Sequence, residues 1–186
     1  MGTLPLEPVT LDEFIAWESY QESRHELVDG RISYFPGVTV GHSTIALAVL
    51  VALRAHVRGS LCRVHGIDMM VETGRGIRYP DAVVTCDERD HEPKIRTLRH
   101  PKLIVEVLSE SSAAVDRGAK LDEYRAIPSL EEYVLIDSRM RWAMAHRRVK
   151  GEWLATSPPG TGAFYFASVG LALELDEIYL EAGVDA

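Results

Sequence analysis

Apolar residues recur at helical spacing in several stretches of this chain. Thr10 to Glu13 has the form of a capping box, and the apolar residues that follow it make one stripe of a short helix. Residues 41–58 are apolar nearly all round, which predicts a helix buried between other elements, and Gly59 is a natural residue to follow its end. The helices are predicted near residues 11–17 and over 41–58, 113–126 and 175–180.

Shorter apolar runs, continuous or alternating with polar residues, predict strands. Asp29-Gly30 and Lys150-Gly151 each separate two such runs, which predicts two tight hairpins. One strand, the helix over 113–126 and a further strand follow one another as a βαβ unit. The strands are predicted within a hairpin at 25–34 and at 61–71, 77–86, 103–108, 133–136, 142–148 and 152–156.

These elements predict an α/β fold with a mixed central sheet flanked by helices and extended by antiparallel hairpins. The 186 residues contain no repeat, linker or low-complexity segment, so we expect a single domain over residues 1–186. An apolar content of 46% and a charged content of 26% are ordinary for a soluble globular protein. No apolar run approaches the roughly 18 residues that a membrane span needs, and the N-terminus lacks the pattern of a signal peptide. We therefore expect a cytoplasmic protein without a membrane partner.

The two cysteines, Cys62 and Cys86, form no CxxC motif and have no metal-ligand spacing. Each falls within a predicted strand. They are therefore expected to be small buried hydrophobes in a reducing cytosol.

The chain has a net charge of −8 and a pI near 5.4. This acidic balance argues against a protein that attracts nucleic acid over its whole surface. Basic residues nevertheless cluster in residues 94–102 and 139–150. These clusters are either solvated faces or parts of a local basic groove. Trp142, with its flanking arginines, also has two interpretations: its ring stacks on bases, or it covers the sheet. The second interpretation is favoured.

One carboxylate stands inside an apolar run, at Glu106 in Leu103 to Leu108. A Glu is almost never fully buried unless a partner compensates its charge, so Glu106 lies at an accessible strand end or faces a cation. Asp81 heads a second apolar strand, and Lys120 follows Glu106 by 14 residues. Two carboxylates with water and phosphate are the oxygen ligands that Mg²⁺ prefers, and a lysine can steer an anionic substrate. The alternative is an Asp at a strand start, a Glu at a sheet edge and a surface lysine.

These segments resemble the PD-(D/E)XK nucleases, the restriction-endonuclease-like superfamily. The wider pattern is similar to one family, the Uma-type restriction endonucleases, which carries His-Glu-Leu-Val-Asp-Gly, Pro-Asp, Val-Glu-Val-Leu-Ser and then Asp, Lys and Tyr on a helix. The resemblance covers roughly residues 10–148, and the order and spacing of the segments make it specific. The matching segments are His25–Gly30, Pro80-Asp81, Val105–Ser109, and Asp116, Lys120 and Tyr124.

The resemblance implies a restriction-endonuclease-like core and a Mg²⁺- or Mn²⁺-dependent endonuclease that hydrolyses DNA phosphodiester bonds. It makes Asp81 and Glu106 the metal ligands and Lys120 the residue that positions water or phosphate. Glu26 becomes a further catalytic acid near the metal, against the alternative of an outward strand residue. His42 stands at the start of the helix predicted over 41–58 and is placed to face the same cleft, although a capping or surface role is favoured for it.

One departure from the superfamily motif leaves a second function open. The motif has a lysine two residues after its acid, whereas this chain has Leu108. Lys120, from the next helix, is the candidate replacement. If Lys120 points elsewhere, the site is expected to keep its metal without catalysis. The acidic pI and the Leu108 departure favour the alternative function, a catalytically inactive nuclease-fold module that binds nucleic acid or protein.

Aromatic clusters predict how the chain assembles. Tyr34-Phe35-Pro36 and Phe164-Tyr165-Phe166 lie beside turns and are more apolar than most loop edges. Aromatic residues are enriched in interface cores, and two-fold dimers are the commonest oligomers. We expect a homodimer, against the alternative that these rings cover the protein's own sheet.

Overall fold

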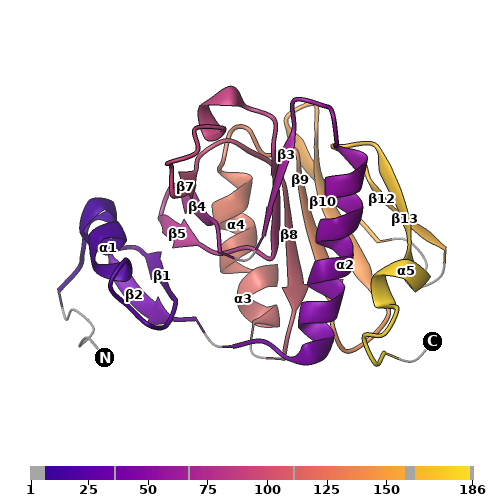
Figure 1. Cartoon of the computed structure of the whole chain (residues 1–186), viewed down its shortest axis with the longest axis horizontal. Coiled ribbons are helices and arrows are strands. Elements are labelled where there is room, and N and C mark those ends of the chain that lie inside the picture. Colours follow the sequence, from indigo (N-terminus) through magenta and orange to yellow (C-terminus); the bar gives the residue numbers. More distant parts are fainter. Residues whose placement is uncertain (1–6, 36, 67, 111, 158–161, 185–186) are drawn as a thin grey trace.

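A computed structural model of the chain describes residues 7–35, 37–66, 68–110, 112–157 and 162–184. Its centre is a six-stranded sheet in the order β11-β10-β9-β8-β6-β3 (Figure 1). β8 and β9 are parallel and the other pairs are antiparallel, so the predicted mixed central sheet is confirmed. Its strands are β3 (Arg63–Gly66), β6 (Ala82–Thr85), β8 (Pro101–Leu108), β9 (Glu132–Asp137), β10 (Ala143–Val149) and β11 (Glu152–Thr156).

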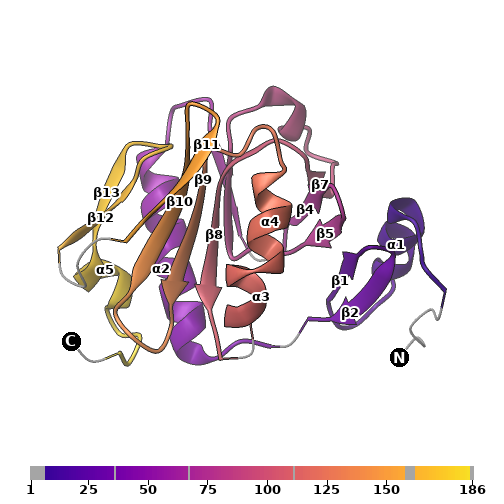
Figure 2. The same cartoon turned by 180° about the vertical axis from the view of Figure 1, so that it is seen from behind.

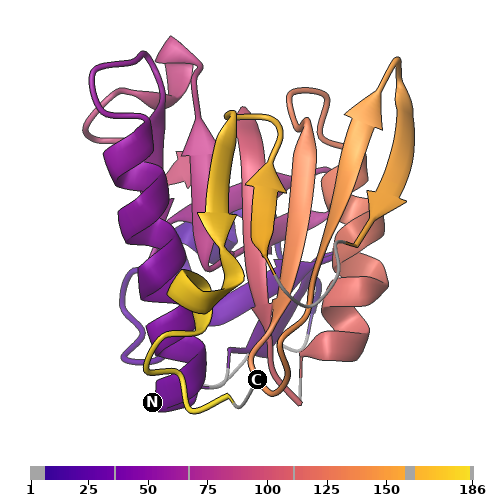
Figure 3. The same ribbon diagram turned by 90° about the vertical axis from the view of Figure 1, so that its right-hand side faces the viewer.

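Helices cover both faces of this sheet, as Figure 3 shows end-on. α2 (Val40–His56) and α5 (Leu175–Tyr179) lie on one face, and α3 (Ala113–Arg117) and α4 (Ala119–Arg125) on the other. Alternate residues of β8 enter the two cores, so Val105 packs with the α2 side and Ile104 with the α4 side. Glu106 shares the parity of Ile104 and therefore faces α4.

A second, five-stranded sheet in the order β2-β1-β5-β4-β7 joins the N-terminal segment to the body (Figure 2). The predicted Asp29-Gly30 turn is confirmed, with φ of 49° and 76°. Gly76 lies so close to β1 that a Cβ there would stand 1.9 Å from the Leu27 carbonyl oxygen. The elements are α1 (Leu11–Glu18), β1 (His25–Val28), β2 (Arg31–Tyr34), β4 (Met70–Thr73), β5 (Gly76–Arg78) and β7 (Thr97–Leu98).

The predicted strands at 61–71 and 77–86 were wrong in extent. Each divides into two strands that enter different sheets, β3 and β4 from the first and β5 and β6 from the second. In the second case the break is Tyr79-Pro80-Asp81, where Pro80 has no N–H to donate to a ladder. The break places Arg78 at the end of one sheet and Asp81 at the start of the other.

The single helix predicted over 113–126 was also wrong in extent. α3 and α4 are separated by Gly118, whose φ of −117° and ψ of −97° lie outside the helical region. Glycine has the weakest helix propensity after proline, so the helix breaks there at little cost. Asp116 and Lys120 still meet across the break, at 3.1 Å.

The C-terminal part contains a hairpin that the sequence pattern missed, β12 (Ala163–Phe166) with β13 (Leu171–Glu174). Phe164 and Phe166 are buried in the α2-side core, while Tyr165 points outward. Two of the three rings in this C-terminal cluster of interface candidates therefore cover the protein's own sheet. The homodimer stays a prediction, and Pro36 of the first cluster lies outside the described residues.

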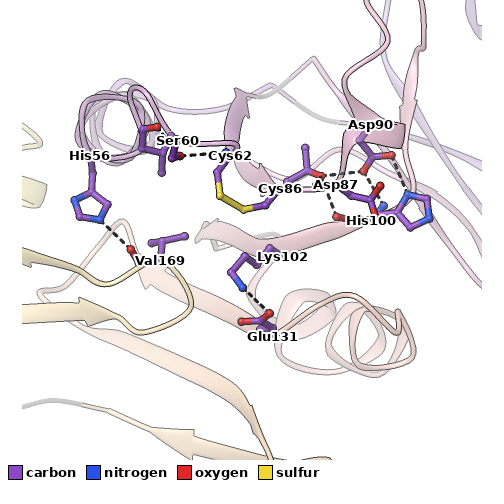
Figure 4. The surroundings of a disulfide bond; sticks show 12 residues. His56, Ser60, Cys62, Cys86, Asp87, Asp90, His100, Lys102, Glu131 and Val169 are labelled. Carbon is purple, nitrogen blue, oxygen red and sulfur yellow. Dashed lines mark hydrogen bonds and ion pairs between the residues drawn. A yellow bond between two sulfur atoms is a disulfide. The ribbon is translucent and has the colours of Figure 1, made fainter.

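The prediction of two free cysteines was wrong. β3 and β6 pair with Arg63 opposite Thr85, so the next pair outward is Cys62 and Cys86, whose Cα atoms lie 4.0 Å apart and whose sulfurs are bonded (Figure 4). Sequence position alone did not reveal this pairing. Disulfides are more typical of oxidising compartments, so the argument from free thiols to a reducing cytosol does not stand, and the cytoplasmic location remains a prediction.

Two further expectations concern surfaces. Trp142 packs against the α4-side core with Arg117 5.0 Å from its ring, which supports its sheet-covering role. None of the helices in the described ranges is long and apolar enough to cross a membrane.

Candidate active site

Asp81 and Glu106 lie side by side on neighbouring strands. β6 and β8 are antiparallel with Ala82 opposite Val105, so the register continued by one residue places Asp81 opposite Glu106. The Val107 N–H donates to Asp81 Oδ2 at 2.7 Å and fixes that carboxylate at the sheet end. The chain thus brings together the two acids that the sequence singled out.

Lys120 points at this pair from α4. Its Nζ donates to Glu106 Oε1 at 3.0 Å, and the Tyr124 hydroxyl donates to the same oxygen at 2.9 Å. Lys120 Nζ also lies 3.1 Å from Asp116 Oδ1. The helix after the strand therefore supplies the lysine that position 108 lacks.

Glu26 reaches the same cluster from β1 of the second sheet. Its Oε1 lies 3.5 Å from Lys120 Nζ, and its Oε2 accepts a 2.6 Å bond from Arg78 Nη1. Glu26 is 8% exposed, so its alternative as an outward strand residue was wrong. Side chains alternate along β1, and Leu27 packs in one cluster with Phe14 of α1. Glu26 therefore faces the opposite side, where β1 pairs with β5 and Arg78 ends that strand.

Arg78 is the site residue that sequence reasoning missed. Its guanidinium bridges Glu26 and Glu123, with bonds of 2.9 and 2.6 Å to the two oxygens of Glu123. Planar two-pronged contact of this kind suits arginine and not lysine. The sequence feature that could have revealed it is an arginine at the end of a strand, three residues before Asp81.

His42 faces the cleft, so the favoured surface role was wrong. It lies in the first turn of α2, where Thr39 caps the helix by accepting from the His42 N–H. Its ring is 5% exposed, and Nε2 lies 2.8 Å from Asp81 Oδ1. Both oxygens of Asp81 are therefore held, one by the ring and one by the backbone of β8.

The cluster carries an excess of buried negative charge. Burial raises the pKa of Glu106 well above its usual value, the Lys120 ammonium opposes that shift, and the charges of Asp116, Asp81 and Glu26 add to it. Burial acts against the charge of Lys120, but Glu106, Glu26 and Asp116 outweigh it and raise the lysine pKa. Lys120 is therefore a cation at neutral pH. Five buried carboxylates face two buried cations: Glu26, Asp81, Glu106, Asp116 and Glu123 against Arg78 and Lys120.

All of these groups except Glu123 line the floor of a pocket of about 230 Å³. Its walls are the end of β2 and the segment after it on one side, and the segment between β8 and α3 with α3 itself on the other. Tyr34, Val38 and Val115 are exposed at its rim.

The donor set fits a hard divalent cation. Glu26 Oε1 is buried without a hydrogen-bond donor in the described part of the chain, and the uncompensated carboxylates favour an added positive charge. Within the described ranges, no three His, Cys, Asp or Glu side chains surround one point closely enough to bind an ion. An ion here would take Asp81 and Glu106 as ligands and fill its other positions from water and phosphate, as Mg²⁺ commonly does.

Comparisons with known proteins place this arrangement in a family. The model of the Uma2 family, described as "Putative restriction endonuclease", matches residues 11–175. The uncharacterized Synechocystis protein slr1290 is 32% identical over 178 residues, covering 94% of this chain and 93% of its own length. A second uncharacterized Synechocystis protein, sll1609, is 29% identical over 160 residues, covering 83% of this chain and 90% of its own length.

A solved structure has the same fold. A crystal structure from Anabaena variabilis, described as a putative nuclease belonging to DUF820, superposes with a TM-score of 0.77 over 94% of this chain and 99% of that one, at 20% identity. The mixed α/β fold with helix-covered sheets is thus shared with that structure. With a family match spanning most of its length, this chain belongs to the Uma2 family of restriction-endonuclease-like proteins.

Proposed function

We propose that this protein is a metal-dependent endonuclease that hydrolyses DNA phosphodiester bonds. The observation that carries the proposal is the meeting of Asp81 and Glu106 on adjacent strands with Lys120, 3.0 Å from Glu106. Two carboxylates and a buried cation at the floor of one pocket suit a reaction in which negative charge develops on a phosphoryl group.

Each residue has a distinct role in this proposal. Asp81 and Glu106 hold Mg²⁺ or Mn²⁺, which when bound lowers the pKa of water and stabilises phosphoryl charge. Lys120 keeps its proton, hydrogen-bonds a phosphate oxygen and orients the attacking water. His42 and the Val107 N–H fix the orientation of Asp81. In the reaction a water oxygen bonds to phosphorus, one bridging P–O bond breaks, and the departing oxygen takes a proton.

Glu26 lies 3.5 Å from Lys120 and is the auxiliary acid of the proposal. Its Oε1 is a buried carboxylate oxygen that lacks a hydrogen-bond donor among the described residues, so it can accept a proton or a hydrogen bond from water. Arg78 holds Glu26 in place by donating to Oε2.

DNA cleavage with each metal tests the proposal. Plasmid and single-stranded DNA are incubated with Mg²⁺, Mn²⁺ or EDTA, comparing the unmodified protein with Asp81→Asn and Lys120→Met. Asp87→Asn is the matched control, since Asp87 is an acid near the other end of β6 that pairs with Arg89. Loss of metal-dependent cleavage in the first two variants alone supports the proposal. Equal cleavage in all of them would identify a contaminating nuclease.

One observation favours a second candidate, a nuclease-fold module that binds without turnover. Glu106 is already held by Lys120 and Tyr124, and the described residues contain no cluster of three or more metal-ligating side chains. This candidate predicts that no metal site depends on Asp81 and Glu106.

A further inference from the structure

The charged groups of the site are buried beneath an exposed rim. Asp81 and Glu106 are 3% and 4% exposed, whereas Tyr34 and Val115 at the rim are 59% and 43% exposed. The phosphates of a duplex are held on the outside of a stiff double helix, which does not enter a pocket of about 230 Å³. An unpaired strand is flexible enough to insert one phosphate with its sugar.

A second cavity adjoins the first. Tyr34, Phe35 and Val38 line the site pocket and also a cavity of about 560 Å³ that contains Tyr79 and Arg96. The end of β2 and the segment that follows it therefore lie between two adjoining hollows. A chain molecule lying over Tyr34 would occupy both.

Few cations near these cavities are free to neutralise phosphates. Arg24 pairs with Asp68 and also lies 5.8 Å from the Tyr79 ring. Arg96 has no carboxylate within ion-pair distance in the part of the chain that the structure describes. Duplex-binding proteins draw most of their affinity from several phosphate contacts. One free guanidinium does not supply that.

Aromatic rings are the stronger feature of this path. Tyr34 is 59% exposed, and the half-buried Phe35 follows it, its ring 6.4 Å from that of Tyr79, which is buried beneath the second cavity. Proteins that bind single strands stack unpaired bases on such rings, whereas the bases of a duplex are already stacked on each other. The surface is therefore suited to a strand whose bases are unpaired.

We infer that DNA enters this site as an unpaired strand. The inference rests on the proposed nuclease function and names its substrate: a base stacks on Tyr34, a neighbouring phosphate contacts Arg96, and the scissile phosphate lies over Asp81 and Glu106. Duplex DNA is then attacked only where it is locally open.

Cleavage of three substrates of one sequence tests this: a labelled single strand, its blunt duplex and the corresponding RNA, each with Mn²⁺. We expect the DNA strand to be cut at least about tenfold faster than the duplex. Duplex cleavage at an equal rate would refute the inference and leave the nuclease function intact. Preference for the RNA strand would refute the choice of DNA.

Binding in EDTA separates the inference from catalysis. Tyr34→Ala should weaken binding of the labelled single strand by about 5- to 150-fold, the range for loss of stacking on one base. Arg96→Ala should flatten the salt dependence by about 0.7 in log–log slope. Tyr165→Ala and Arg54→Ala are matched controls, since Tyr165 is 50% exposed on β12 and Arg54 is exposed on α2. If the strand binds through Tyr34 but no DNA is cut, the nuclease proposal fails and the inference about single-strand binding stands. If Tyr34→Ala binds like its control, the inference fails.

Discussion

Replacing Arg78 by Met removes the cation that holds two buried carboxylates. The guanidinium is 4% exposed and makes three hydrogen bonds of 2.6–2.9 Å, one to Glu26 and two to Glu123. Breaking a buried ion pair from one side costs about 3 to 5 kcal/mol, because the remaining charge is left without compensation. With a urea m-value of about 2 kcal/mol per M, the unfolding midpoint should fall by about 2 M.

The matched control is Arg75→Met, three residues away on the same β4–β5 hairpin. Arg75 pairs with Asp29, but both side chains are about half exposed, so the midpoint should hardly change. Urea unfolding followed by circular dichroism measures both variants. A second variant tests the cause: Glu123→Gln in the Arg78→Met background should recover part of the loss. If Arg78→Met unfolds at the same urea concentration as Arg75→Met, the buried network does not stabilise the fold as described.

Three further predictions concern other parts of the molecule. The raised pKa of Glu106 means that the folded state keeps the Glu106 proton above pH 4.5, so this group lowers the free energy of unfolding as pH rises from 4.5 toward neutrality. In urea unfolding at a series of pH values, Glu106→Gln should therefore gain stability relative to the unmodified protein over that range. A stability difference between the two proteins that does not change with pH would contradict this. The bond between Cys62 and Cys86, 24 residues apart, should contribute about 3 to 4 kcal/mol; denatured protein should titrate no free thiol, and reduction should lower the unfolding midpoint. His42→Gln, which keeps a side-chain donor, should retain much more cleavage than His42→Leu, and equal rates would show that the bond to Asp81 does not matter.

The sequence predicted the core of the site because its signals are local. An acid inside an apolar run needs a cation, and Lys120 and Tyr124 lie at helical spacing in the next element. The same pattern placed Asp81 at the head of the neighbouring strand, and β6 and β8 pair as that required. A break at Gly118 did not disturb this arrangement, because Asp116 still reaches Lys120.

What the sequence did not predict depends on contacts between distant segments. Arg78 acts through Glu123, 45 residues later, and His42 reaches Asp81 from a helix on the opposite face of the sheet. The partner of Cys62 is fixed only by the register of β3 against β6. None of these pairings follows from local periodicity.

Titration of Mn²⁺ into the protein by calorimetry tests the central claim, that Asp81 and Glu106 together hold a catalytic metal. The account predicts a site in the unmodified protein at millimolar metal or below, lost in Asp81→Asn and in Glu106→Gln. The site should be kept in Asp87→Asn, whose carboxylate lies outside the cluster. Binding that is absent from the unmodified protein, or unchanged in the two site variants, would contradict the claim and favour a binding module without catalysis.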